Sequence, residues 1–205
     1  LTKLPAADGD ICAYTATRLL DSKTFLLSSF HGDTNGLATA PVVDAVHNYH
    51  KHFMEKESSL LFGLDANTHF DCSDNEKLAC VEDFAKKFAG HKMDSCYGSS
   101  FDAADYKYTT FNARTYLQPQ LNKAVKASEK FTSSLVDKNP KDFMLFYNTD
   151  LKLNGPTLKD NTGVGTFTED IVFPTLQFPS DHAISRAEFV AADEEDTLDI
   201  DSTTK

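Results

Sequence analysis

The 205-residue sequence contains no tryptophan, only three methionines and no long uninterrupted apolar segment. A membrane-spanning helix needs about 18 or more apolar residues in a row, so no membrane span is predicted. The opening stretch, LTKLPAADGD, lacks the basic and apolar pattern of a secretory signal peptide. It also lacks methionine, so we expect the chain to start inside a longer polypeptide or after processing.

Cysteine is scarce as well, with four residues at positions 12, 72, 80 and 96. Their spacing matches no zinc motif such as CxxC. Cys72 and Cys80 would pair in a secreted protein. Four free thiols in a soluble cytoplasmic or nuclear protein is our default expectation, although the sequence leaves the compartment open.

Positive charge is outweighed, because 20 Lys and Arg stand against 31 Asp and Glu and the net charge is −11. This balance disfavours unselective binding to nucleic acid or to an anionic membrane. Residues 107–141 are the exception, with seven Lys or Arg against two acidic residues. That segment either faces a phosphate or forms a solvated helix face. Residues 191–205 are expected to be an acidic, disordered tail.

Hydrophobic residues make up 40% of the chain and charged residues 25%, which is ordinary for a globular protein. The length suits one domain, which we place at residues 1–190. Periodicity predicts strands at 10–20, 24–31, 59–65, 141–153 and 182–190, and helices at 40–57, 74–90 and 121–135. In the first helix the expected inward stripe is Val42, Val46, Tyr49 and Phe53. Mixed elements of this kind indicate an α/β or α+β domain.

Polar residues suited to catalysis lie where these strands meet loops, which is where such folds assemble their sites. Asp65 and Asn67 end one strand two residues apart, so their side chains point the same way. A carboxylate and an imidazole stand together in FPSDHAI, at Asp181 and His182. Taken alone, Asp65 and Asn67 are better explained by a strand-end turn, and Asp181 and His182 are explained equally well by a structural role at a strand start.

The order of four motifs along the chain favours the catalytic explanation of these residues over the structural one. SSFHG, GLDANTH, KDFMLFY and PSDHAI resemble, in sequence order, the motifs of the endonuclease/exonuclease/phosphatase superfamily, which includes pancreatic deoxyribonuclease. The resemblance runs from about Thr24 to Phe189. It implies a DNase-I-like fold, a two-sheet β-sandwich flanked by helices. It also implies hydrolysis of a phosphodiester or phosphomonoester with Mg²⁺ or Mn²⁺.

The resemblance implies the role of each residue. Asp65 would orient or deprotonate the attacking water, and Asn67 would hold water and phosphate. His182, polarised by Asp142, would contact the scissile phosphate, and His31 would be a second imidazole facing it.

Metal and substrate contacts follow by the same resemblance and by charge. Asp181 would be a metal ligand. Arg114, Gln118 and Asn35 are expected to bind substrate, Arg114 because a guanidinium pairs with phosphate in a two-pronged manner. The alternatives are a structural ion pair for Arg114 and a simple turn role for Asn35. We expect a monomer acting on a phosphate ester, with nucleic acid or a nucleotide first and a small molecule or lipid headgroup second.

Two departures from the superfamily pattern stand out. Leu64 intervenes between Gly63 and the motif Asp, and the early strands that bear an Asn and the metal-binding Glu are absent upstream. Glu55 and Glu57 lie on a polar helix end and are poor substitutes. The chain therefore resembles the C-terminal part of such an enzyme. The alternative is a non-catalytic binding or scaffold domain that keeps the fold without a complete metal site.

Overall fold

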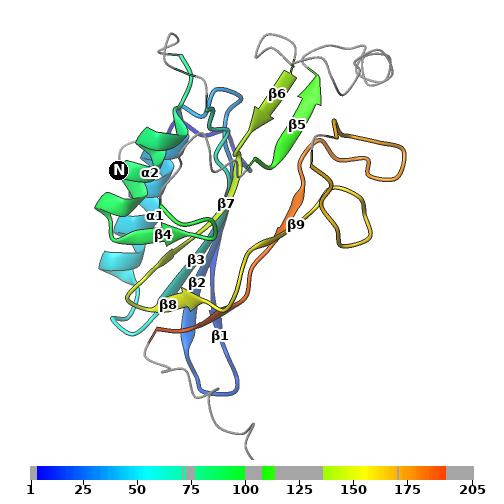
Figure 1. Cartoon of the computed structure of the whole chain (residues 1–205). Helices are drawn as coiled ribbons and strands as arrows, with labels where there is room; N and C mark the ends of the chain where they lie inside the picture. Colours follow the sequence, from blue (N-terminus) through cyan, green and yellow to red (C-terminus); the bar gives the residue numbers. More distant parts are fainter. Residues whose placement is uncertain are drawn as a thin grey trace, which may run out of the picture.

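The computed structural model describes residues 4–70, 72, 77–99, 108–113, 136–169 and 171–192. Its main feature is a five-stranded sheet in the order β1-β2-β3-β7-β4, with two helices packed on one face (Figure 1). The elements are β1 Ile11–Thr17, β2 Thr24–His31, α1 Thr39–Phe53, β3 Ser59–Asp65, α2 Val81–Gly90, β4 Met93–Ser95, β5 Thr110–Ala113, β6 Val136–Asn139, β7 Asp142–Tyr147, β8 Leu151–Leu153, β9 Leu158–Asp160, β10 Ile184–Arg186 and β11 Phe189–Ala191.

The first strands form as the sequence pattern predicts. β1 and β2 make an antiparallel hairpin, and β2 then pairs in parallel with β3 through the crossover helix α1. A parallel pair requires such a crossover, because its two strands start at the same end. β7 completes the centre by pairing antiparallel with β3, and β4 adds an edge.

The main core lies between this sheet and the two helices. Alternate residues of the strands face it, as Leu26 and Phe30 do in β2, in keeping with the period of two in a strand. On α1 the buried residues are Thr39, Val42, Val43, Val46 and His50. The predicted stripe was wrong at its C-terminal end, because Tyr49 and Phe53 are 48% and 76% exposed. The buried face turns toward His50, which bonds to Ser58, and the rings of Tyr49 and Phe53 stack on each other at the surface.

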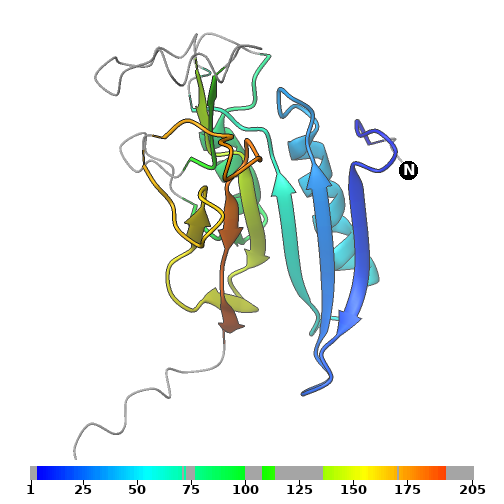
Figure 2. The same ribbon diagram turned by 90° about the vertical axis from the view of Figure 1, so that its right-hand side faces the viewer.

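The second layer consists of three two-stranded ladders, β10-β9, β11-β8 and β5-β6. They lie on the side of the large sheet away from the helices (Figures 1 and 2). Two predicted long strands are each divided, 141–153 into β7 and β8 and 182–190 into β10 and β11. The first break is a turn closed by the Asp150 amide, which donates to the Tyr147 carbonyl. The predicted α+β class is confirmed.

Cys72 and Cys80 form a disulfide, so the expectation of four free thiols was wrong. Their Cα atoms lie 5.6 Å apart, within the range that a disulfide spans. Cys12 is an exposed thiol and Cys96 a buried one.

Across the described ranges, no helix combines the length and the apolar character needed to cross a bilayer. The predicted helix at 121–135 and residues 193–205 lie outside the described residues.

Candidate active site

Three side chains share one row because of the register of three neighbouring strands. His31, the last residue of β2, pairs with Asp65, the last residue of β3, and Asp65 pairs with Asp142, the first residue of β7. Directly paired residues point to the same face of a sheet. The residues next to them in the chain are buried in the core shared with the helices: Phe30, Leu64 and Phe143. The row therefore faces away from the helices.

His182 reaches this row from the second layer, where it forms a β-bridge with Thr110. Its Nδ1 lies 2.9 Å from Oδ2 and 3.1 Å from Oδ1 of Asp142. An ionised carboxylate only accepts hydrogen bonds, so Nδ1 is the donor. Nε2 lies 3.9 Å from Asp65 Oδ2. His31 approaches the same oxygen, with its Nε2 at 3.6 Å, and its side chain is 75% exposed. Two imidazoles thus flank one carboxylate.

Asn67 holds the Asp65 carboxylate in place. Its φ of 48° lies in the left-handed region, which Asn tolerates better than most residues. The Asn67 backbone N–H donates to Asp65 Oδ1 at 2.9 Å. Its side-chain Nδ2 donates to Asp65 Oδ2 at 3.1 Å and to the Gly32 carbonyl at 2.9 Å. Both side-chain hydrogens are used inside the protein, so in this geometry Asn67 orients Asp65. Its direct contact with phosphate stays a prediction.

Burial and neighbouring charge set the protonation of the central groups. Burial raises the pKa of Asp65, and the Asp142 charge raises it further, against the opposing effect of His182. Burial alone would lower the pKa of His182. The hydrogen bond and charge of Asp142, helped by Asp65, outweigh that effect and raise the pKa of His182 to about 8. The site therefore combines a carboxylate of increased basicity with an imidazole that favours its protonated form near neutral pH.

The donor set fits a divalent cation. Asp65, Asp142 and His182 each offer one ligand atom, and these atoms lie within 4.8 Å of one another. Two carboxylates with an imidazole suit Mn²⁺, and the carboxylates suit Mg²⁺. Asp181 is exposed and is not a member of this group of three among the described residues. Its role as a ligand stays a prediction.

One buried contact of the site had no signal in the sequence. Thr109, whose exposed fraction is 0%, donates its hydroxyl to Asp142 Oδ2 at 2.6 Å. It lies 33 residues before Asp142, within a Thr-rich, aromatic stretch that predicted only an ordered loop. A contact of this kind depends on how β5 and β6 fold back on the start of β7, and no local pattern encodes that return.

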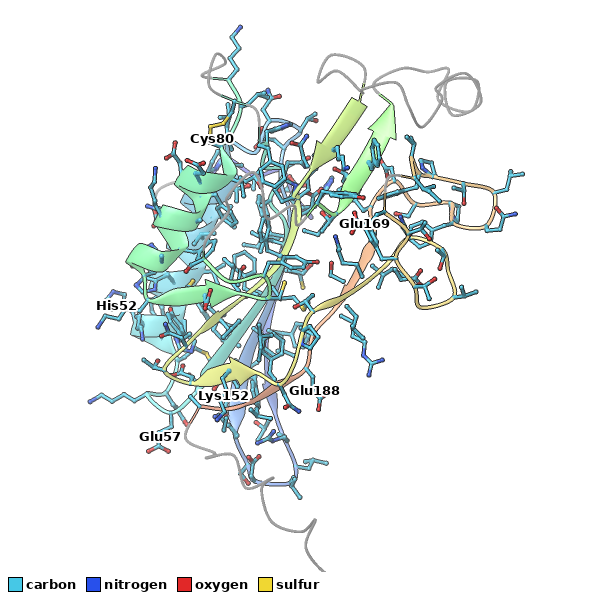
Figure 3. The ribbon with its side chains drawn as sticks, in the orientation of Figure 1. His52, Glu57, Cys80, Lys152, Glu169 and Glu188 are labelled. Atoms are coloured by element: carbon cyan, nitrogen blue, oxygen red, sulfur yellow. A yellow bond between two sulfur atoms is a disulfide. The ribbon has the colours of Figure 1, made fainter. Side chains whose placement is uncertain are left out.

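The remaining predicted residues fall in three places. Asn35 is exposed in the loop between β2 and α1, and its carbonyl accepts the Ala79 amide hydrogen. Arg114 and Gln118 lie outside the described residues. Glu55 and Glu57 precede β3, whereas Asp65 ends it. Figure 3 accordingly shows Glu57 at the opposite end of the molecule from Cys80, the residue that directly precedes α2. Neither glutamate completes a metal site with Asp65.

No protein-family model matches the chain, and no curated protein matches it. Solved structures do. The catalytic domain of human nocturnin, with bound sulfate anion, is 14% identical with a TM-score of 0.46, covering 88% of this chain and 52% of that one. TDP2 from D. rerio, complexed with single strand DNA product, is 10% identical with a TM-score of 0.49, covering 88% and 61%.

An endonuclease/exonuclease/phosphatase family protein from Bacteroides thetaiotaomicron is 12% identical with a TM-score of 0.46, covering 90% of this chain and 57% of that one. The chain spans between about half and three fifths of the length of these three structures.

Proposed function

We propose that this chain is a divalent-metal-dependent phosphoesterase domain of the endonuclease/exonuclease/phosphatase type. A single observation carries the proposal: residues far apart in the sequence meet at one edge of the sheet, on its open face. They are His31, Asp65, Asn67, Asp142 and His182. Each motif of the resemblance supplies at least one member of the set.

In the proposed reaction, water attacks the phosphorus atom while the bond to the leaving oxygen breaks. Asp65 accepts the proton of the water, and its raised pKa makes it the more basic for that task. Asn67 fixes the direction of the Asp65 carboxylate. His182 and His31 place positive charge or N–H donors beside the phosphoryl oxygens, where negative charge grows.

A Mg²⁺ or Mn²⁺ ion would be held by the carboxylates of Asp65 and Asp142, with Asp181 as the further predicted ligand, while His182 keeps its proton for the phosphate. When bound, the ion neutralises the phosphate and stabilises the leaving oxygen. For the substrate, the Lys- and Arg-rich stretch 107–141 favours a nucleotide or a short single strand. A phosphorylated small molecule or a lipid headgroup is the second class.

Hydrolysis of bis-p-nitrophenyl phosphate in Mg²⁺ or Mn²⁺ tests the proposal. Asp65→Asn and His182→Gln should each lower kcat/KM by about 100-fold or more, because each removes an acid-base group. Asp83→Asn on α2 and His52→Gln on α1 are the matched controls, since both side chains are exposed on the helices, and both should keep parental activity. Parental rates in Asp65→Asn and His182→Gln would refute the assigned roles.

A non-catalytic binding or scaffold domain is the second candidate, favoured by the position of Glu55 and Glu57 far from Asp65. Isothermal titration with Mg²⁺ and Mn²⁺ separates the two candidates. Heat of binding that disappears in Asp65→Asn supports the enzyme. No heat from the parent protein, together with no hydrolysis, supports the binding domain.

A further inference from the structure

The Asp142–His182 pair joins two segments that come from different layers of the fold. Asp142 begins β7 of the large sheet, whereas His182 precedes β10 of a small ladder. Nothing in the local chain fixes the distance between them, so a third group must hold both segments. Thr109 contacts both.

On the Asp142 side, the Thr109 hydroxyl is used completely. It donates to Asp142 Oδ2 at 2.6 Å and accepts the backbone N–H groups of Lys141 and Asp142, each at 3.0 Å. One oxygen therefore fixes both the start of β7 and the carboxylate that this strand carries. A hydroxyl offers one donor and two acceptor sites, and all three are engaged.

On the His182 side, the contact is through the backbone. The Thr109 carbonyl accepts the Ala183 amide hydrogen at 2.8 Å, and Thr110 forms the β-bridge to His182. The Thr109 amide in turn donates to the Asn139 carbonyl at 3.0 Å. Thr109 is thus hydrogen-bonded both to the segment that carries Asp142 and to the segment that carries His182.

We infer that Thr109 is a positioning residue for the Asp142–His182 pair. Its hydroxyl holds the Asp142 carboxylate so that both oxygens lie near Nδ1 of the imidazole, and Nε2 is then presented toward Asp65. The inference rests on the proposed function for its effect on turnover. Its effect on the order of the hydrogen bond between Asp142 and His182 does not depend on the proposed function and can be measured without turnover.

Thr110 provides a matched control. It is also fully buried, and its hydroxyl makes two hydrogen bonds where that of Thr109 makes three: it donates to the Asn139 carbonyl and accepts the Asn139 amide hydrogen. Neither bond involves Asp142. Thr110→Val and Thr109→Val therefore remove the same group from adjacent buried sites, and Thr109→Ser restores the hydroxyl at the position under test.

Steady-state hydrolysis of bis-p-nitrophenyl phosphate is the first readout. Thr109→Val should lower kcat by about 10- to 100-fold, the range typical for groups that orient active-site residues, with KM little changed. Thr109→Ser should recover most of the rate. Thr110→Val should lose comparable thermal stability but keep its kcat. Parental kcat in Thr109→Val, or an equal loss in Thr110→Val, would overturn the inference.

The second readout needs no activity. In proton NMR of the metal-free protein, the Nδ1–H resonance of His182 is assigned by its absence from His182→Gln. It should persist in the parent, Thr109→Ser and Thr110→Val, and exchange at least about tenfold faster with water, or vanish, in Thr109→Val. An unchanged resonance in Thr109→Val refutes the positioning role even if the parent hydrolyses nothing. An inactive parent whose Thr109→Val variant loses the resonance refutes only the proposed function.

Discussion

At the scale of single residues, the His182–Asp142 pair makes stability depend on pH. The Asp142 carboxylate raises the pKa of His182 from 6.5 to about 8, although burial opposes this shift. A histidine whose pKa is higher in the folded state binds its proton more tightly there. The resulting stabilisation is fully present below pH 6.5 and is lost as the pH rises through 8.

The predicted magnitude follows from the shift. In EDTA, the free energy of unfolding of the parent relative to His182→Gln should fall by about 2 kcal/mol between slightly acidic and alkaline pH. Urea unfolding at a series of pH values measures this difference. Asp142→Asn should remove most of the dependence, because it removes the charge that raises the pKa. A difference between parent and His182→Gln that stays constant with pH would contradict the assignment.

Two of the catalytic residues could be predicted from the sequence, whereas two of the contacts that hold them could not. Asp65 and His182 were predicted from motif and strand position, because strand ends place polar side chains at one edge. Thr109 was missed, since its partner Asp142 is remote in sequence. The full use of the Asn67 amide hydrogens was missed as well, because it depends on the Gly32 carbonyl in a neighbouring loop.

At the scale of elements, the loop between β2 and α1 packs directly beneath the Asn67 backbone. Gly36 in this loop has φ +72°, and a Cβ there would lie 2.6 Å from the Asn67 carbonyl oxygen and 2.8 Å from that of Ala66. A side chain is therefore excluded by contact as well as by backbone conformation. The loop sets the position of the residue that orients Asp65.

Substitution of Gly36 by Ala should therefore cost stability and turnover together. Gly165→Ala is the matched control, with φ +81° and open space around its Cβ position. Gly165→Ala should lower the free energy of unfolding by only about 1 to 2 kcal/mol, because a residue with a Cβ is strained in the left-handed conformation. It should keep kcat. Gly36→Ala should cost more and lower kcat as the Asn67 backbone moves. Urea unfolding and steady-state kinetics give both values, and equal effects of the two substitutions would contradict the packing argument.

The elements themselves were largely predictable where the hydrophobic period was regular. The hairpin 11–31, the helix starting near residue 40 and the strand 59–65 all form as expected. The divided strands β7/β8 and β10/β11 were not predicted. The polar triplet 148–150 offered a turn signal that was missed, whereas Ala187 and Glu188 in the second break are not turn residues. The disulfide between Cys72 and Cys80 was expected only for a secreted protein, since sequence spacing does not show whether two Cα atoms lie within disulfide range.

At the scale of the whole molecule, sheet register turns a linear order of motifs into one site. Parallel pairing of β2 with β3 and antiparallel pairing of β3 with β7 bring two strand ends and one strand start to the same edge. The small ladders then deliver His182 from the other side. Helices fill the opposite face, so the chemistry and the main core are separated by the sheet (Figures 1 and 2).

The most direct test of the account is whether this edge binds phosphate. Inorganic phosphate would be titrated into the Mg²⁺-supplemented protein while the imidazole resonances are followed by NMR. The account predicts saturable shifts of His31 and His182, with His52, exposed on α1, unchanged as the internal reference. Unmoved resonances for His31 and His182, or shifts confined to the α1 histidines, would contradict it.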